Sequence, residues 1–507
     1  MNVGQLLTLV ASKHPQRSAI LFENKRFTYR EFNQRANRFA HSLLRLGLRK
    51  GDKVAVLLFN SNHFAEVYFG TAKIGGVFAP INFRLAGEEV LYILNHSDAR
   101  FFVFGEEFAA LVTTIRPRLS KVEVFMSVGK DTPPQTFDYE TLLRNSKSLE
   151  PNRSVSEKDE CQLMYTSGTT GRPKGAVITH QNVLWNLLNT ILGREDKEGE
   201  VSLVIGPLYH TAALNNHFTL RVALGGTTIL IKHFDPRGVM EIIEMERVNV
   251  ISGAPAIYHL LLNLPDSKRY DTRSVTKCTA GAAILPDETK RGLLKLFPNS
   301  IGIYDVYGCT EASPCITILK AADSLRKQEC VGQPLPFLEV RIVDDRDRDV
   351  SQGEVGELTC RGPNVMKGYY KNKKATGKAL KGGWLHTGDL ARMDEEGFVY
   401  IVDRKKDMII SGGENIYPRE IEEVLYHHPK IQEAAVIGIP DPLWGESVKA
   451  FVALKSGESM EEREVIEYCK TRLASYKKPK SVEFIGSLPR NPSGKVLKTI
   501  LREQTQK

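Results

Sequence analysis

The 507 residues exceed what a single hydrophobic core usually holds, so two or more domains are expected. The composition, 42% hydrophobic and 25% charged, is ordinary for a globular protein, and no apolar run is long enough to span a bilayer. The 69 Lys and Arg residues against 60 Asp and Glu residues give a net charge of +9. A positive net charge can attract nucleic acid, an anionic membrane or a polyanionic small substrate, or it can reflect only a solvated basic surface with no partner.

The seven cysteines are scattered, odd in number and form no CxxC pair. This pattern argues against a disulfide framework or a zinc site and suits a reducing cytosol. The N-terminal stretch is apolar but lacks a basic segment before it, so it predicts an amphipathic helix rather than a signal peptide. We therefore expect a cytoplasmic protein.

Strand and helix patterns alternate along the first part of the chain. Residues 53–60 (KVAVLLFN) predict a buried strand, residues 64–74 a helix and residues 77–81 a second strand. Further strands are predicted at residues 201–205, 227–231 and 248–252. Alternation of this kind indicates βαβ units, and hence an α/β fold with mixed or mostly parallel sheets flanked by helices.

From about Val331 the pattern changes to short β-rich pieces between Gly and Asp turns, which suggests a small antiparallel sheet or barrel. A charge cluster at residues 403–407 precedes a Gly-rich loop and an α+β tail, with helices predicted at residues 418–427 and 460–473 and strands at residues 434–438 and 449–454. We predict a large N-terminal domain (residues 1–402), with a β-barrel-like subdomain at about residues 331–402, and a small α+β C-terminal domain (residues 403–507).

The segment YTSGTTGRPKG at residues 165–175 has the chemistry of a phosphate-binding loop. Its glycines let the backbone approach a ligand, and its hydroxyl and N–H donors suit phosphate oxygens. The order differs from the GxxxxGK[ST] loop, because Gly175 follows the lysine, and on composition alone an exposed turn explains the segment equally well. The candidate phosphate-binding residues are Thr166, Ser167, Gly168, Thr169, Thr170, Gly171 and Lys174.

This segment resembles the signature of the adenylate-forming superfamily: acyl- and aryl-CoA synthetases, peptide-synthetase adenylation domains and beetle luciferases. Further segments resemble its other motifs in order: GAA at residues 281–283, YGCTE at 307–311, WLHTGD at 384–389, DRKKD at 403–407 with SGGENI at 411–416, and PRNPSGK at 489–495. The resemblance therefore covers most of the chain, and it is slightly stronger to bacterial fatty-acyl-CoA synthetases than to plant-type aryl ligases.

The resemblance implies a two-step reaction that uses ATP, Mg²⁺ and coenzyme A. A carboxylate attacks the α-phosphate of ATP, giving an acyl-adenylate and pyrophosphate, and the thiol of coenzyme A then displaces AMP. Lys495 would bridge the attacking carboxylate and the α-phosphate, although a lysine in such a loop is usually only solvated. Thr310 would donate to the α-phosphate, and Glu311 would bind Mg²⁺, with helix capping as the plain alternative.

The same resemblance implies a nucleotide site. Its adenine side would be formed by Gly281, Ala282, Ala283, Tyr307 and Gly308. The Tyr307 ring could stack on adenine or simply pack in a core. Asp389 would accept hydrogen bonds from the ribose hydroxyls and Arg404 would reach the same ribose, although a β-turn also explains the Gly-Asp pair.

Asp403 would be the hinge about which a mobile C-terminal domain rotates between the two half-reactions. Rotation would remove Lys495 and present a second face to coenzyme A. That face would carry Ser411, Gly412, Gly413, Glu414 and Lys477. Its glycines would allow a narrow pantetheine tunnel, whereas the lysine-rich run at residues 477–480 could meet the coenzyme A phosphates or only be solvated.

His210 would wall the acyl pocket and gate catalysis, although a lone histidine among apolar residues is more often structural. The other candidate pocket residues, Ala212, Ala213, Val306 and Ser313, are small or apolar. They favour an uncharged, fairly bulky tail. A medium- or long-chain fatty acid ranks first, with an aromatic or alicyclic acid as the alternative.

The expected partners are thus a small carboxylic acid, ATP and coenzyme A. An enzyme that loads a separate carrier protein remains open, although residues 210–216 lack the Asp that usually holds a substrate amine. A luciferase-like oxygenase shares every motif and also remains open. Nucleic-acid binding is not expected, since no Lys/Arg stripe with interleaved aromatic residues is present. With a long-chain substrate, the basic surface would allow weak peripheral contact with an anionic membrane.

Overall fold

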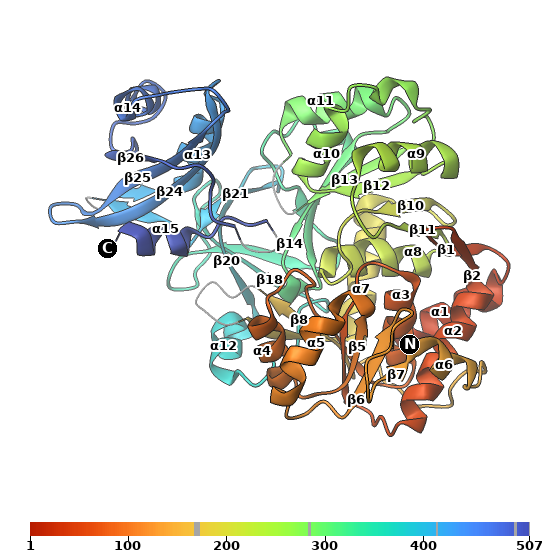
Figure 1. The fold of residues 1–507 in the computed structure, drawn as a ribbon. Coiled ribbons are helices and arrows are strands. Elements are labelled where there is room, and N and C mark those ends of the chain that lie inside the picture. The colour runs from red at the N-terminus through yellow and green to blue at the C-terminus, as the bar shows by residue number, and fades with distance from the viewer. Residues whose placement is uncertain (167–172, 282–284, 412–413, 491–493, 506–507) are drawn as a thin grey trace. The chain divides into compact units, whose positions relative to one another are not determined.

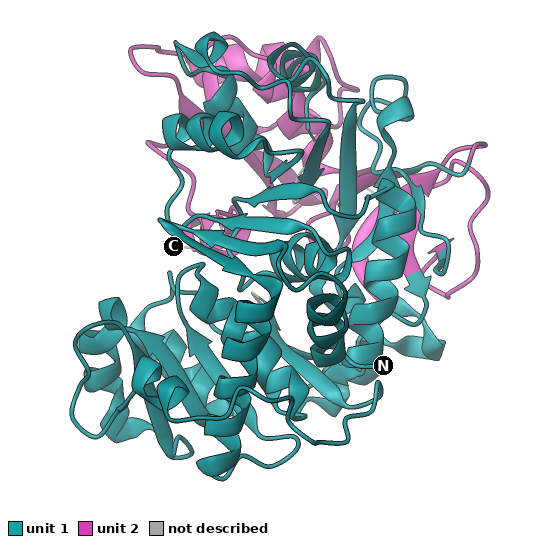
Figure 2. Ribbon diagram, turned by 90° about the vertical axis from the view of Figure 1, so that its right-hand side faces the viewer, with its two compact units in different colours: residues 1–340, 360–385, 397–399 teal, residues 341–359, 386–396, 400–507 magenta. Residues whose placement is uncertain are grey.

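The computed structural model describes residues 1–166, 173–281, 285–411, 414–490 and 494–505. Contacts divide the chain into two compact units, which Figure 2 shows in different colours. The first unit comprises residues 1–340, 360–385 and 397–399, and the second comprises residues 341–359, 386–396 and 400–507. The two units are defined by contacts within each unit. The predicted domain boundary at Asp403 and its role as a pivot therefore stay predictions.

The first unit contains an eight-stranded sheet in the order β19-β9-β8-β4-β3-β5-β6-β7, of which Figure 1 labels β5, β6, β7 and β8. Its strands are β3 (Lys53–Leu57), β4 (Val77–Pro80), β5 (Ala99–Gly105), β6 (Val124–Val128), β7 (Phe137–Asp138), β8 (Glu160–Thr166), β9 (Lys174–Thr179) and β19 (Gly368–Tyr369). The six neighbouring strands β8, β4, β3, β5, β6 and β7 pair in parallel. Strand β9 pairs antiparallel with both β8 and β19.

The first unit also contains a nine-stranded sheet in the order β16-β15-β14-β13-β12-β10-β11-β1-β2. Its strands are β1 (Ser18–Phe22), β2 (Lys25–Thr28), β10 (Val201–Val204), β11 (Thr227–Leu230), β12 (Val250–Gly253), β13 (Lys277–Gly281), β14 (Ile303–Gly308), β15 (Cys315–Leu319) and β16 (Gln333–Pro334). The six central strands are parallel, as the βαβ rhythm predicted.

Helices cover both sheets. They are α1 (Val3–Lys13), α2 (Tyr29–Arg45), α3 (Asn62–Lys73), α4 (Gly87–Ser97), α5 (Ala109–Ile115), α6 (Tyr139–Arg144), α7 (His180–Arg194), a π-helix (Ala212–Thr219), α8 (Leu220–Ala223), α9 (Pro236–Glu246), α10 (Pro255–Leu262), α11 (Asp287–Leu296) and α12 (Lys373–Ala379). Helix α2 shows why they form: a Thr28–Glu31 capping box starts it, and Phe32, Phe39 and Leu43 share its buried face. The largest core joins α1, α2, α3 and α7 to strands of both sheets, and α9, α10 and α11 lie together beside β12 and β13 (Figure 1).

A four-stranded sheet, β17 (Glu339–Val343), β18 (Gly356–Arg361), β20 (Leu385–Met393) and β21 (Val399–Arg404), matches the predicted short β-rich region. The tail forms a five-stranded sheet with three helices. These elements are β22 (Ile409–Ser411), β23 (Glu414–Ile416), α13 (Pro418–Tyr426), β24 (Ile431–Asp441), β25 (Gly445–Leu454), α14 (Glu462–Lys470), β26 (Ser481–Phe484) and α15 (Lys498–Thr505). The predicted α/β fold with an α+β tail is therefore confirmed.

Element ends differ from the predictions where side chains decide them. The strand predicted to reach Asn60 ends at Leu57. Instead, Asn60 accepts the Leu208 N–H at 2.8 Å and donates to the Gly206 carbonyl at 3.0 Å, which links the loop after β3 to the loop after β10.

None of the helices in the described ranges has the length and apolar character needed to cross a lipid bilayer.

His180, at the start of α7, makes the stability of the first unit depend on pH. Its Nδ1 accepts the Val3 N–H at 3.2 Å, the side chain is fully buried, and burial lowers its pKa from 6.5 to about 4. Because the unfolded chain takes up this proton more readily, the contribution is complete above pH 6.5 and is lost as the pH falls through 4. We expect a loss of about 3 kcal/mol across that window.

The check is urea unfolding at several pH values for the wild type and for His180→Asn, whose amide oxygen can accept the same N–H but does not titrate. The variant should lose less stability between pH 6.5 and 4. Parallel stability curves for the two proteins would contradict the assignment.

Candidate active site

The carboxyl ends of parallel strands in the nine-stranded sheet bring several predicted residues to one edge. Gly281 ends β13 and pairs with Val306 of β14, which continues through Tyr307 to Gly308. His210 follows β10, the parallel neighbour of β12. Open α/β sheets bind ligands outside this edge, so the fold places these segments where a substrate site is expected. The predicted Ala282 and Ala283 lie outside the described residues.

Thr310 and Glu311 follow β14 in a short 3₁₀ helix (Thr310–Ala312). The Thr211 hydroxyl donates to the Thr310 hydroxyl at 3.3 Å, which joins the loop after β10 to the end of β14. Thr211 is buried and directly follows His210. Thr211 was not predicted as a site residue, since nothing in the local pattern indicates a contact across 99 residues.

Gly308 has no room for a side chain. A Cβ built there would lie 1.8 Å from the Pro314 carbonyl oxygen. We therefore expect Gly308→Ala to force the backbone of β14 or of residue 314 to move and to lower the free energy of unfolding by about 1–3 kcal/mol. Urea denaturation measures this loss. Gly377→Ala is the matched control, because a Cβ there would have no atom of the described residues within 4 Å; this variant, in helix α12, should be neutral or slightly stabilising. Equal stability of the two variants would contradict the expectation.

The phosphate-binding candidate closes a hairpin. Thr166 ends β8 and pairs with Lys174, the first residue of β9, and its hydroxyl lies 3.4 Å from the Lys174 carbonyl. Helix α4 supports both stems, because Tyr92 donates to the Pro173 carbonyl at 3.3 Å and His96 Nδ1 lies 2.8 Å from the Tyr165 hydroxyl. The predicted Ser167, Gly168, Thr169, Thr170 and Gly171 lie outside the described residues.

One side chain that was not predicted as a site residue links two of the motifs. The Tyr369 hydroxyl donates to Glu311 Oε1 at 2.6 Å, and the Lys174 ammonium lies 4.5 Å from the centre of the Tyr369 ring. The structure thus brings Lys174 and Glu311, 137 positions apart in the numbering, to the same side chain. The adjacent tyrosines at positions 369 and 370 were the only signal, and the sequence does not say which neighbour each would meet.

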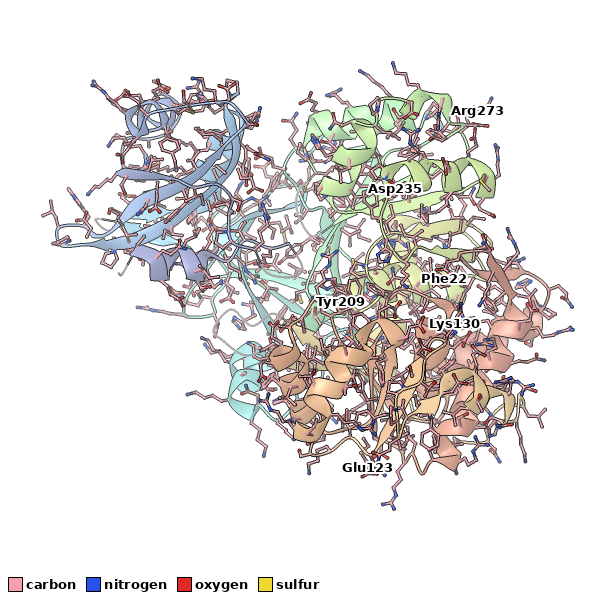
Figure 3. All side chains as sticks on the ribbon, in the orientation of Figure 1. Phe22, Glu123, Lys130, Tyr209, Asp235 and Arg273 are labelled. Atoms are coloured by element: carbon pink, nitrogen blue, oxygen red, sulfur yellow. The ribbon has the colours of Figure 1, made fainter. Side chains whose placement is uncertain are left out.

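His210 and the acyl-pocket candidates lie around the π-helix. The His210 ring is 4.5 Å from the ring of Tyr209, which Figure 3 labels. His210 is exposed to solvent, but desolvation by the groups packed around it and the charge of Arg84 lower its pKa to about 4. His210 is therefore neutral near pH 7. Ala212 and Ala213 begin the π-helix, whereas Ser313 is fully buried and its carbonyl accepts from Asn215 at 3.2 Å.

The second unit holds its own cluster of predicted residues. Asp389 on β20 accepts a hydrogen bond from the Arg404 guanidinium on β21. Burial and the charge of Arg404 lower the pKa of Lys495, while Asp389 acts in the opposite direction, so the three side chains interact electrostatically. This unit therefore brings together the two ribose candidates and the candidate catalytic lysine.

Asp403 and the coenzyme A candidates also lie in this unit. The Asp403 carboxylate accepts the N–H groups of Arg404 at 2.6 Å and Arg419 at 2.9 Å, and burial raises its pKa. Ser411 and Glu414 are directly paired between β22 and β23; Gly412 and Gly413 lie outside the described residues.

Lys477, expected at the coenzyme A phosphates, already has an acidic partner. Its ammonium contacts both carboxylate oxygens of Glu420, at 2.7 and 2.8 Å. Its role at coenzyme A stays a prediction.

Comparison with known proteins gives matches over nearly the whole chain. A family model described as AMP-binding enzyme matches residues 7–370, and one described as AMP-binding enzyme C-terminal domain matches residues 420–495. A feruloyl-CoA synthase of an Amycolatopsis species is 38% identical, with 97% of each chain covered. A long-chain-fatty-acid–CoA ligase of Mycobacterium tuberculosis is 37% identical, covering 99% of this chain and 98% of the relative.

Among solved structures, an o-succinylbenzoate CoA synthetase of Bacillus subtilis in complex with its acyl-adenylate intermediate has a TM-score of 0.86 and 31% identity. The match covers 99% of this chain and 98% of that structure.

Proposed function

The chain belongs to the AMP-binding enzymes and is an adenylate-forming CoA ligase, and on that premise we propose that its preferred acid is a medium- or long-chain fatty acid. The side chains after β10 and at the end of β14 carry the first part of the proposal, that the acyl group is uncharged. Val306 and the alanines of the π-helix offer small apolar surface, and the neutral His210 brings no charge to it. A 37% identical relative named as a long-chain-fatty-acid–CoA ligase supports the same choice.

An aromatic acid is the second candidate, because a relative of 38% identity is named feruloyl-CoA synthase. A flat ring needs the same uncharged surroundings as an alkyl chain, so small apolar side chains do not separate the two classes. The length and width of the acyl site would decide between them.

In the first half-reaction, a carboxylate oxygen attacks the α-phosphorus of ATP, the bond to the β-phosphate oxygen breaks, and pyrophosphate leaves. Lys174 and Thr310 would bind phosphate oxygens, with Tyr307 against the adenine. Asp389 and Arg404 would hold the ribose. Lys495 would lie between the carboxylate and the α-phosphate and stabilise the negative charge that both bring to the reaction.

Glu311 is suited to hold Mg²⁺ at the phosphates. It is a half-buried residue that directly follows Thr310, and Mg²⁺ commonly takes one or two protein carboxylates and completes its shell with water and phosphate oxygens. Bound Mg²⁺ supplies charge neutralisation at the phosphate groups.

In the second half-reaction, the sulfur of coenzyme A attacks the acyl carbon, the bond from that carbon to the phosphate oxygen breaks, and AMP leaves. Ser411, Glu414 and Lys477 would then face coenzyme A after a rotation about Asp403, with His210 gating the approach of the thiol. Lys477 would have to share its charge between Glu420 and a coenzyme A phosphate.

The test is AMP release from ATP and Mg²⁺ with coenzyme A and a panel of acids: acetate, octanoate, palmitate, benzoate, 4-coumarate, ferulate and cyclohexanecarboxylate. The highest kcat/KM is expected with octanoate or palmitate. A preference for 4-coumarate or ferulate would overturn the fatty-acid assignment in favour of the aromatic one. Turnover that requires a carrier protein instead of coenzyme A would overturn the choice of acceptor.

A further inference from the structure

Tyr369 touches two side chains of opposite charge. Its hydroxyl donates to the Glu311 carboxylate at 2.6 Å, and its ring face carries the Lys174 ammonium at 4.5 Å from the ring centre. The contact distance on the Lys174 side is that of a cation–π interaction. Among the described residues no ion pair joins Lys174 to Glu311, although both contact the same side chain.

The backbone around Tyr369 is fixed from both sides. The Met366 N–H donates to the Glu311 carbonyl at 2.7 Å, and the Tyr370 N–H donates to the Gly175 carbonyl at 2.8 Å. The Tyr369 N–H itself donates to the Thr376 hydroxyl at 2.9 Å. Residues 366–370 therefore bridge the segment of Glu311 and the strand that begins at Lys174, and the Tyr369 ring is held between them.

We propose that Tyr369 is a positioning residue that keeps Lys174 and Glu311 apart, and so keeps both charges available to the nucleotide. The inference rests on the function proposed above, in which Lys174 meets phosphate oxygens and Glu311 meets Mg²⁺. A direct Lys174–Glu311 ion pair would satisfy each charge with the other. ATP with Mg²⁺ would then have to break that pair before it bound.

The two functions of the side chain can be separated by substitution. Tyr369→Phe keeps the ring face for Lys174 and removes only the hydroxyl that orients Glu311. Tyr369→Leu removes both contacts and lets the two charges approach each other. The leucine variant should therefore be impaired much more than the phenylalanine variant, and mainly in binding ATP with Mg²⁺.

Isothermal titration of ATP with Mg²⁺, without the acid, measures this directly. We expect Tyr369→Leu to weaken binding about tenfold or more, the cost of breaking a partly buried ion pair, and Tyr369→Phe to weaken it several-fold less. The Mg²⁺ concentration needed for half-maximal ATP binding should rise in both variants. Tyr370→Phe is the matched control, because the Tyr370 hydroxyl donates to Asp98 at 2.9 Å and touches neither charge.

A double-mutant cycle distinguishes this role from a structural one. In the Glu311→Gln background Lys174 has no carboxylate to pair with, so adding Tyr369→Leu should cost less than threefold. An undiminished tenfold loss in that background would overturn the proposal, as would wild-type binding by Tyr369→Leu. If the wild type itself bound no ATP, the proposed function would fail, whereas normal wild-type binding with insensitive Tyr369 variants would remove this inference alone.

Discussion

Replacing Lys495 by alanine is expected to slow acyl-adenylate formation by about 10²-fold or more, the size typical of a lost charge-stabilising donor. The structure places the Lys495 ammonium in the electrostatic field of Arg404 and Asp389, and its pKa is lowered by burial and by Arg404. Asp389 acts in the opposite direction and favours the charged form of the lysine. Pyrophosphate release with ATP and acid but without coenzyme A measures the effect.

The same variant should convert supplied acyl-adenylate and coenzyme A to acyl-CoA at close to the wild-type rate, within about tenfold. Lys470→Ala is the control, since the Lys470 ammonium pairs with Glu467 on the exposed face of α14. Equal losses in both half-reactions would contradict the assigned role, because they would point to a general defect of the second unit.

The second large effect is expected for Glu311→Gln, which should reduce adenylation by about 10²-fold and raise the Mg²⁺ concentration that the reaction requires. The substitution keeps the shape of the side chain and an oxygen that can still accept from the Tyr369 hydroxyl. It removes the negative charge that a hard cation prefers. Initial rates over a Mg²⁺ titration measure both changes.

AMP binding should be nearly unaffected by Glu311→Gln, because that ligand lacks the β- and γ-phosphates. The control is Glu339→Gln, an exposed carboxylate paired with Arg361. An unchanged Mg²⁺ requirement in Glu311→Gln would show that Glu311 is only a structural residue after β14.

The features that the sequence predicted best depend on local pattern. The strand at residues 77–81 was placed to within one residue, and the parallel core of the nine-stranded sheet followed from the alternation of strands and helices. Helix ends were less accurate, since caps decide them: α3 begins at Asn62 because Ser61 accepts the Phe64 N–H at 3.3 Å.

Contacts between distant segments could not be predicted. Lys174 and Glu311 were both chosen by resemblance, but nothing in their motifs indicates that Tyr369 lies between them. Lys477 was assigned to coenzyme A from a run of lysines, and its bidentate contact with Glu420 depends on how α13 packs in the tail. Such pairings arise from tertiary packing. They leave no periodic pattern in the local sequence from which they could be predicted.

The most direct test of the central claim is a single-turnover experiment with ATP labelled in the α-phosphate, Mg²⁺ and the best acid of the panel. We predict that labelled acyl-adenylate accumulates on the enzyme without coenzyme A, and that adding coenzyme A converts it to labelled AMP and acyl-CoA. Labelled AMP that forms only with coenzyme A, with no adenylate trapped beforehand, or labelled ADP as the product, would contradict the two-step account.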